Sequence, residues 1–163
     1  MTRHSGFLLL EVAVVGAILA LMVGISWPLA DELNRIAVRT EVAQLCVALQ
    51  QLQHRALTTG VEQQLIFDER GYGTKELHHT LNPRVYFGAA TDAKGPPTQP
   101  RAPISTAITF AHKKISCTKY GILSAGTIYL TDQEHQISYA VSVPVGGYYH
   151  TQYRWNGMAW ESH

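Results

Sequence analysis

The pattern of apolar and polar positions changes twice along the chain. Residues 7–30 are almost continuously apolar and carry a single charge, Glu11. From residue 31 to about 60 polar residues enter, but apolar ones still recur every three or four positions, as on one face of a helix. From Gln63 onward the period is two, as in strands. The sequence therefore predicts an α+β protein in which a long N-terminal helix packs on a C-terminal antiparallel β domain.

The first two segments form one predicted helix, because neither Gly nor Pro occurs between Leu29 and Thr59, and Gly60 is a natural stop. The 24 residues from 7 to 30 would rise about 36 Å, enough to cross a hydrocarbon layer of about 30 Å. Pro28 should bend the helix, since proline removes one backbone bond. The amphipathic half places apolar residues at spacings of three and four, apart from the steps Ile36 to Ala37 and Ala37 to Val42. These residues are Leu33, Ile36, Ala37, Val42, Leu45, Leu49, Leu52 and Ala56.

The β domain is predicted from short alternating runs. They cover residues 64–67, 85–87, 107–110, 128–131 and 136–143, with a further strand within 148–155. Residues 132–135 and Asn156-Gly157 are predicted turns. Four prolines (Pro96, Pro97, Pro100 and Pro103) indicate a surface loop over residues 92–103.

Glu11 needs an explanation, because a carboxylate in an apolar membrane helix costs about 2.5–3.5 kcal/mol on insertion scales. Cleavage after Gly6 would leave a free amino group on Phe7, one helical turn before Glu11. That amine, or the one of a neighbouring subunit, could pair with the carboxylate. Such pairing would also fix the axial stagger between parallel helices.

The segment Gly6-Phe7-Leu8-Leu9-Leu10-Glu11, followed by the apolar run, resembles the prepilin cleavage and methylation signature of type IV pilins and type II secretion pseudopilins. The resemblance implies cleavage by a prepilin peptidase between Gly6 and Phe7, and N-methylation of Phe7. It also implies subunit assembly through Glu11 and a helix kink at Pro28. Leu8 departs from the Thr that is frequent in the family.

The same resemblance divides the chain into four parts. They are a leader over 1–6, a transmembrane and filament-core helix over 7–30, its amphipathic continuation over 31–60 and an antiparallel β domain over 61–163. Arg55-Ala56 at the end of the helix, Thr59-Gly60, and the strand 64–68 are similar to the GspH/FimT type of minor pilin or pseudopilin.

This type implies a structural subunit, not an enzyme, that helps to initiate or cap a type II secretion pseudopilus or a type IV pilus. It would cross the inner (cytoplasmic) membrane once, with its C-terminal domain outside the cytoplasm, before entering a filament. The implied partners are the prepilin peptidase, other pilin or pseudopilin subunits and inner-membrane lipid. No cofactor is implied.

Two alternative functions stay open. One is a DNA-binding minor pilin of a competence pilus. The charge balance of 13 Lys and Arg against 12 Asp and Glu makes DNA the less favoured partner, and the basic run His112, Lys113, Lys114 and Lys119 is typical of a solvated face. The other is a secreted β domain with an ordinary signal peptide, although Pro28-Leu29-Ala30 fits a cleavage site poorly.

The remaining candidate chemistry is limited. Cys46 and Cys117 could form one disulfide outside the cytoplasm or stay as two buried thiols. His78 and His79 are adjacent, so in a strand they would point to opposite faces and would not share a metal ion. The sequence has no Ser/His/Asp order, phosphate loop or paired carboxylates that would indicate catalysis.

Overall fold

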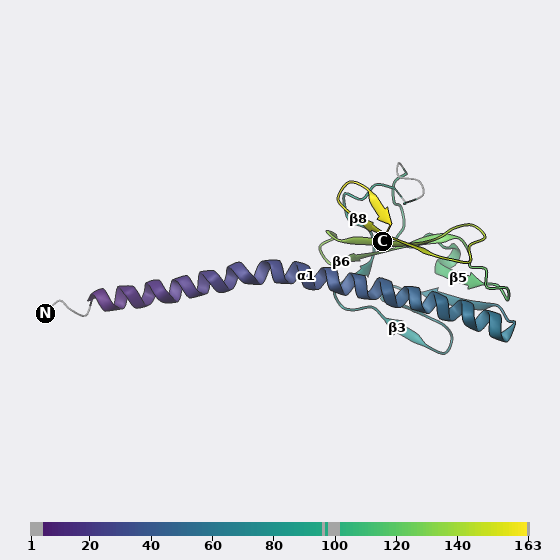
Figure 1. Cartoon of the computed structure of the whole chain (residues 1–163), viewed down its shortest axis with the longest axis horizontal. Helices are drawn as coiled ribbons and strands as arrows, with labels where there is room; N and C mark the ends of the chain where they lie inside the picture. Colours follow the sequence, from purple (N-terminus) through teal and green to yellow (C-terminus); the bar gives the residue numbers. More distant parts are fainter. Residues whose placement is uncertain (1–4, 96, 98–101, 163) are drawn as a thin grey trace. The chain divides into compact units, whose positions relative to one another are not determined.

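The computed structural model describes residues 5–95, 97 and 102–162, and within the helix it describes no side chains for residues 5–9 and 23–30. In chain order, the elements are α1 (Ser5–Thr59), β1 (Gln63–Phe67), β2 (Gly71–Gly73), β3 (His78–Thr80), β4 (Val85–Phe87), the single-turn helix η1 (Ala111–Lys113), β5 (Lys114–Cys117), β6 (Gly126–Asp132), β7 (Ser138–Val143), β8 (Thr151–Trp155) and β9 (Trp160–Ser162). A helix followed by antiparallel strands confirms the predicted α+β class (Figure 1).

The chain divides into two compact units, Met1–Leu33 and Asn34–His163. The described part of the first unit is entirely helical from Ser5. Within the part of the chain that the structure describes, no helix is long and apolar enough to cross a membrane.

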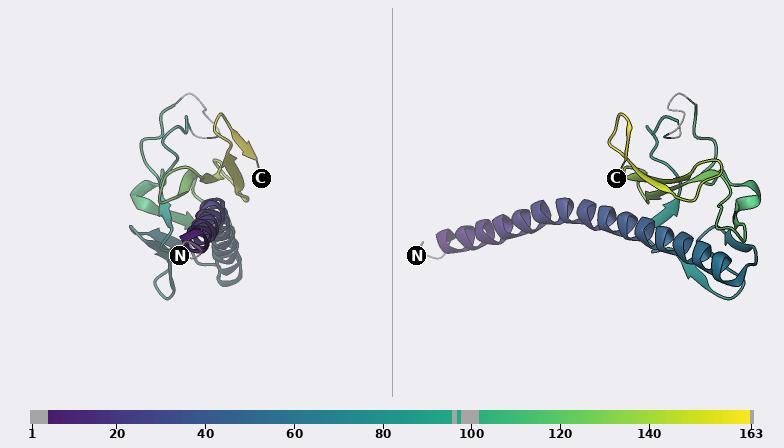
Figure 2. Two further views of the ribbon diagram at one scale, coloured as in Figure 1. Left: turned by 90° about the vertical axis from the view of Figure 1, so that its left-hand side faces the viewer. Right: turned by 45° about the vertical axis from the view of Figure 1, so that its right-hand side comes forward.

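The second unit holds two antiparallel sheets. One has the strand order β3-β2-β1-β5 and the other β4-β6-β7-β8-β9. Figure 1 shows strands β6 and β8 on one side of the second half of α1 and strand β3 on the other side. Figure 2 shows the same strands from two further directions. The expected hairpin turn at 132–135 joins β6 to β7, and Asn156-Gly157 lies between β8 and β9, so both predicted turns are confirmed.

The hydrophobic core lies between α1 and the two sheets. Its members on α1 are Val38, Val42, Leu45, Cys46, Leu49, Leu52 and Ala56. The predicted stripe is therefore confirmed from Val42 to Ala56 but wrong at its start. Leu33 and Ile36 are exposed, whereas Val38 is fully buried. At about 100° per residue, Leu33 and Ile36 lie on the opposite side of the helix from Val38, so they are out of phase with the buried stripe.

The β6–β7 hairpin is covered on both faces, which simple alternation did not predict. All six residues of β7 are buried, and Tyr129 on the outer face of β6 is 1% exposed. The ring of Trp160 lies 5.6 Å from that of Tyr129, and the Trp160 Nε1 donates a hydrogen bond to the carbonyl of Gly95. The β8–β9 hairpin and the segment around Gly95 thus cover this face.

Other strand predictions differ in detail. The run 107–110 forms a single bridge between Ile108 and Ile128 instead of a strand, although Ile108 and Phe110 are buried as expected. The β2–β3 hairpin was not predicted. The proline-rich loop 92–103 falls in part on residues 96 and 98–101, which lie outside the described residues.

Candidate functional site

The predicted processing site lies at the start of α1. Gly6 and Phe7 belong to its first turns, and their side chains lie outside the described residues, as do residues 1–4 of the expected leader. Glu11 is an exposed residue of the same helix, four positions after Phe7. Because residues four apart share a helix face, a free amino group on Phe7 would lie on the side of Glu11. α1 continues without a break through Pro28, whose side chain is not described, so the kink stays a prediction.

The helix after Glu11 presents apolar side chains on every side. Its large members are Val12, Val14, Val15, Ile18, Leu19, Leu21 and Met22, and each is between 50% and 65% exposed, as is Leu10 before Glu11. Apolar area in water costs about 25 cal/mol per Å² relative to an apolar environment. A helix that is apolar all round therefore requires a covering of lipid or of other protein.

A buried carboxylate in the second unit, Glu41, was missed by the sequence analysis, which assigned only apolar residues to the buried face of the helix. Glu41 is 5% exposed. Its Oε2 lies 2.8 Å from Nε2 of His79, and its Oε1 accepts a hydrogen bond of 2.9 Å from the backbone N–H of Asn82. The spacing indicates that Glu41 lies on the buried face of the helix, because it follows Val38 by three positions and precedes Leu45 by four.

The β2–β3 hairpin is fixed by histidine–carboxylate pairs on two sides. His78 lies 2.6 Å from Asp68, while His79 reaches Glu41 on α1. This confirms that the two histidines point to opposite faces. The backbone N–H of Arg70 and the ring of His78 hydrogen-bond to Asp68 and hold the pKa of its carboxyl below the usual value. Among the described residues, no group of three or more His, Cys, Asp or Glu could hold a metal ion.

A mainly apolar groove of about 460 Å³ separates α1 from this hairpin. The helix supplies Thr40, Ala43, Gln44, Val47, Ala48 and Gln51, and the hairpin supplies Tyr72, Leu77 and His79. A pocket of about 70 Å³ shares five of these residues and extends to Leu52 and Arg55. Burial and, second, the charge of Glu41 raise the pKa of Tyr72, so this phenol stays neutral beside the groove.

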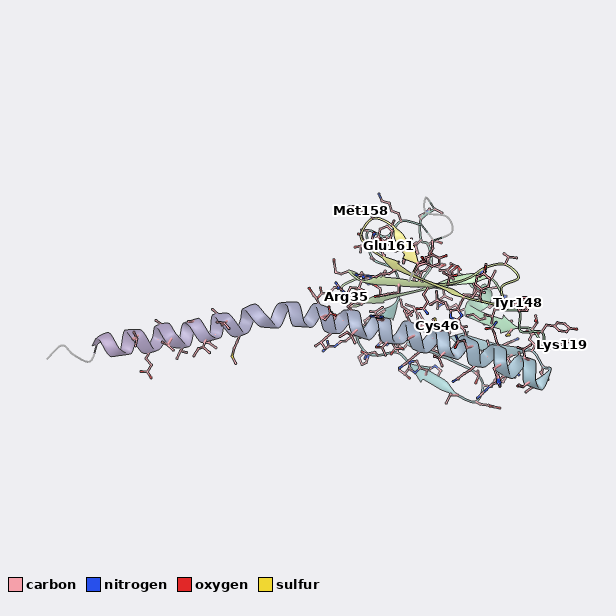
Figure 3. All side chains as sticks on the ribbon, in the orientation of Figure 1. Arg35, Cys46, Lys119, Tyr148, Met158 and Glu161 are labelled. Atoms are coloured by element: carbon pink, nitrogen blue, oxygen red, sulfur yellow. The ribbon has the colours of Figure 1, made fainter. Side chains whose placement is uncertain are left out.

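Cys46 and Cys117 are both buried and both free, so of the two expected arrangements the structure has two buried thiols and no bridge between them. Figure 3 labels Cys46 on the second half of α1, where the core lies. Burial raises the pKa of Cys46 to about 11, and burial also raises the pKa of Cys117. These thiols are therefore protonated at neutral pH and poor nucleophiles.

The basic run is distributed over different elements. His112 and Lys113 lie in η1, Lys114 begins β5, and Lys119 lies in the following turn with its Nζ 5.0 Å from the ring centre of Tyr120.

Comparison with protein-family models, with curated proteins and with solved structures finds no match for this chain.

Proposed function

We propose that this chain is a minor pilin or pseudopilin of the GspH/FimT type, a structural subunit of a type II secretion pseudopilus or a type IV pilus. The observation that carries the proposal is the apolar run 7–30, which follows Gly6, bears one carboxylate, Glu11, and is exposed over its described side chains, 10–22. The same helix continues into an amphipathic half that is covered by antiparallel strands.

In the proposed sequence of events, a prepilin peptidase in the inner membrane removes residues 1–6 and Phe7 is N-methylated. The helix 7–30 then holds the subunit in lipid, with the β domain outside the cytoplasm. Neighbouring apolar helices can replace the lipid at little cost, because both surroundings are apolar. Pairing of Glu11 with an amino group would set the register, since an unpaired carboxylate there is unfavourable.

N-terminal sequencing of the membrane-bound or filament-bound protein tests this proposal. We expect the mature chain to begin at Phe7. Gly6→Val should leave the leader attached, and Ser5→Ala is the matched control that should be processed normally. A mature chain that keeps Met1 would contradict the proposal, and a start near Asp31 would support the secreted β domain instead.

One observation favours a second candidate, a DNA-binding minor pilin. Tyr120, Tyr148 and Tyr149 are each more than 60% exposed, and Lys119 lies beside Tyr120. Gln53 donates to the carbonyls of Gly121 and Tyr148 and so holds the two loops against α1 (Figure 3 labels Lys119 and Tyr148). Exposed tyrosines can stack on unpaired bases.

A gel-shift titration of the full chain in detergent with single-stranded DNA tests this candidate. Binding through these residues should weaken with salt and with Tyr148→Ala, whereas Met158→Ala, another exposed position, should change nothing. The absence of any shifted band would remove this candidate and leave the structural role.

A further inference from the structure

We propose that the groove between α1 and the β2–β3 hairpin receives the apolar helical segment 10–22 of a neighbouring copy of this chain. The inference rests on the proposed function, because an assembled filament is what brings such a neighbour close. It adds a defined receiving surface on the second unit, made by residues 40–51 of α1 and 72–79 of the hairpin.

The groove has the shape that a helix needs. Ala43 and Ala48 on its α1 side are small, so another helix backbone can approach closely. Val47 is half exposed at the centre of this side, and Leu77 stands 66% exposed on the hairpin wall. Two exposed apolar side chains facing one open groove are typical of a surface that is covered in an assembly.

The charges identify the occupant as an uncharged helix. The titratable groups along the groove are His79, which is already bound to Glu41, and the neutral phenol of Tyr72, with Arg55 in the connected pocket. A charged partner would lose its hydration here without gaining a counter-charge. Segment 10–22 carries one charge, Glu11 at its beginning, and offers Val14, Ile18 and Leu21 at the spacing by which helices fill grooves.

The two surfaces are also different from each other and lie on the same polypeptide. Each subunit therefore contributes one groove and one apolar segment. A contact between unlike surfaces is heterologous, and such contacts propagate into open helical assemblies instead of closing into dimers. This agrees with a filament and disfavours an isolated two-fold dimer.

Disulfide trapping between two tagged full-length copies tests the inference. One copy carries Val47→Cys and the other Ile18→Cys, with Leu19→Cys as a second partner that covers the adjacent helix row. After mild oxidation of cells that assemble the filament, we expect a mixed dimer on a non-reducing gel. Its yield should be at least about tenfold above that of Gln133→Cys with Ile18→Cys, because Gln133 is an exposed turn residue away from the groove.

Equal yields from Val47 and Gln133, or no mixed dimer with either Ile18 or Leu19, would overturn the inference. Occupation of the groove by lipid would give that same negative result. Val47→Lys gives a second measurement, since the charge should lower the filament-bound fraction about tenfold. Gln50→Lys, on an exposed helix position outside the groove, should not lower it.

N-terminal sequencing of the same samples separates this inference from the proposed function. A chain that starts at Phe7 and enters filaments without a mixed dimer leaves the function standing and ends the groove contact. A mixed dimer from a chain that keeps Met1 supports the contact and contradicts the processing. A start near Asp31 would remove segment 10–22 and end both.

Discussion

Glu41 is the residue whose environment departs most from what its type suggests. It is a carboxylate within the core-facing stripe of α1, and it connects the helix to β3 through His79 and to the chain before β4 through Asn82. A buried charge is tolerated when its oxygens are hydrogen-bonded. Sequence reasoning could not identify these partners, because they lie 38 and 41 positions away in the chain.

Replacing Glu41 should destabilise the second unit. Glu41→Ala leaves the N–H of Asn82 without its partner and removes the contact to His79, so we expect a loss of about 1.5–3 kcal/mol in the free energy of unfolding. Denaturant titration followed by tryptophan fluorescence measures it, with exposed Glu134→Ala as the control. If Glu41→Ala were as stable as the control, the buried pair would contribute nothing.

The two cysteines allow a chemical measurement on single side chains. With a pKa of about 11 instead of 9.0, the Cys46 thiol should have roughly 100-fold less thiolate at pH 8 than an ordinary thiol. Above about pH 9 the unfolded chain loses the thiol protons of Cys46 and Cys117, whereas the native chain keeps them. The free energy of unfolding therefore falls as pH rises through that range.

We therefore expect a thiol reagent at pH 8 to label the native chain very slowly and to label two thiols after denaturation without reductant. Free thiols counted before and after adding a reductant provide the control. Two labelled thiols in the denatured, unreduced protein would confirm free cysteines. If labelling instead required prior reduction, Cys46 and Cys117 would be bridged.

Among the elements, α1 shows how far periodicity determines structure. Spacing identified Val42, Leu45, Leu49, Leu52 and Ala56 as core residues, because a helix that packs on a sheet buries one stripe. The same spacing also included Leu33 and Ile36, which are exposed. The period breaks between Ile36 and Val42, and Leu33 and Ile36 lie about half a turn away from the buried stripe that Val38 begins.

This distinction predicts unequal effects of equivalent substitutions. Leu49 is fully buried, so Leu49→Ala should lower the free energy of unfolding by about 2–5 kcal/mol. Leu33→Ala removes the same atoms at an exposed position and should change it by less than about 0.5 kcal/mol. Denaturant unfolding of the full chain in detergent compares the two, and equal losses would mean that Leu33 is covered after all.

The β2–β3 hairpin could not be predicted from propensity, because each strand has three residues and β2 reads Gly-Tyr-Gly. Glycine normally weakens a strand. Here it is required, since a Cβ at Gly71 would meet the carbonyl of His79 and one at Gly73 would meet that of Leu77. The hairpin thus depends on close backbone approach and on the histidine–carboxylate pairs, and the groove depends on the hairpin.

At the scale of the chain, the α+β class and the order of one long helix before antiparallel strands were predicted from the sequence, whereas the β2–β3 hairpin was not. Segment 7–30 and its role were predicted from its composition and from the motif at Gly6 to Glu11. The groove was not predicted, because its residues come from separate segments, 40–55 and 65–79. Surfaces of this kind arise only when the elements pack.

Assembly should depend on Glu11 in a way that folding does not. Glu11→Ala removes the carboxylate from an exposed helix position, so we expect normal processing, normal membrane binding and an unchanged free energy of unfolding. If the proposed pairing of Glu11 sets the register, the fraction recovered in filaments should fall by about tenfold or more. Sheared filaments compared with membranes by immunoblot give this fraction.

Glu11→Asp keeps the charge on a shorter side chain and should restore part of the assembly. Unchanged filament content in Glu11→Ala would show that the register has another source. Loss of processing would instead show that Glu11 contributes to recognition by the peptidase.

The core of the second unit includes no described residue before Ala37. The described side chains of residues 10–22 and 31–36 therefore take no part in this core. The apolar segment 10–22 can therefore exchange lipid for protein without changing the contacts that the strands make within the core. If the proposed function is correct, such a subunit would enter and leave a filament without unfolding its β domain.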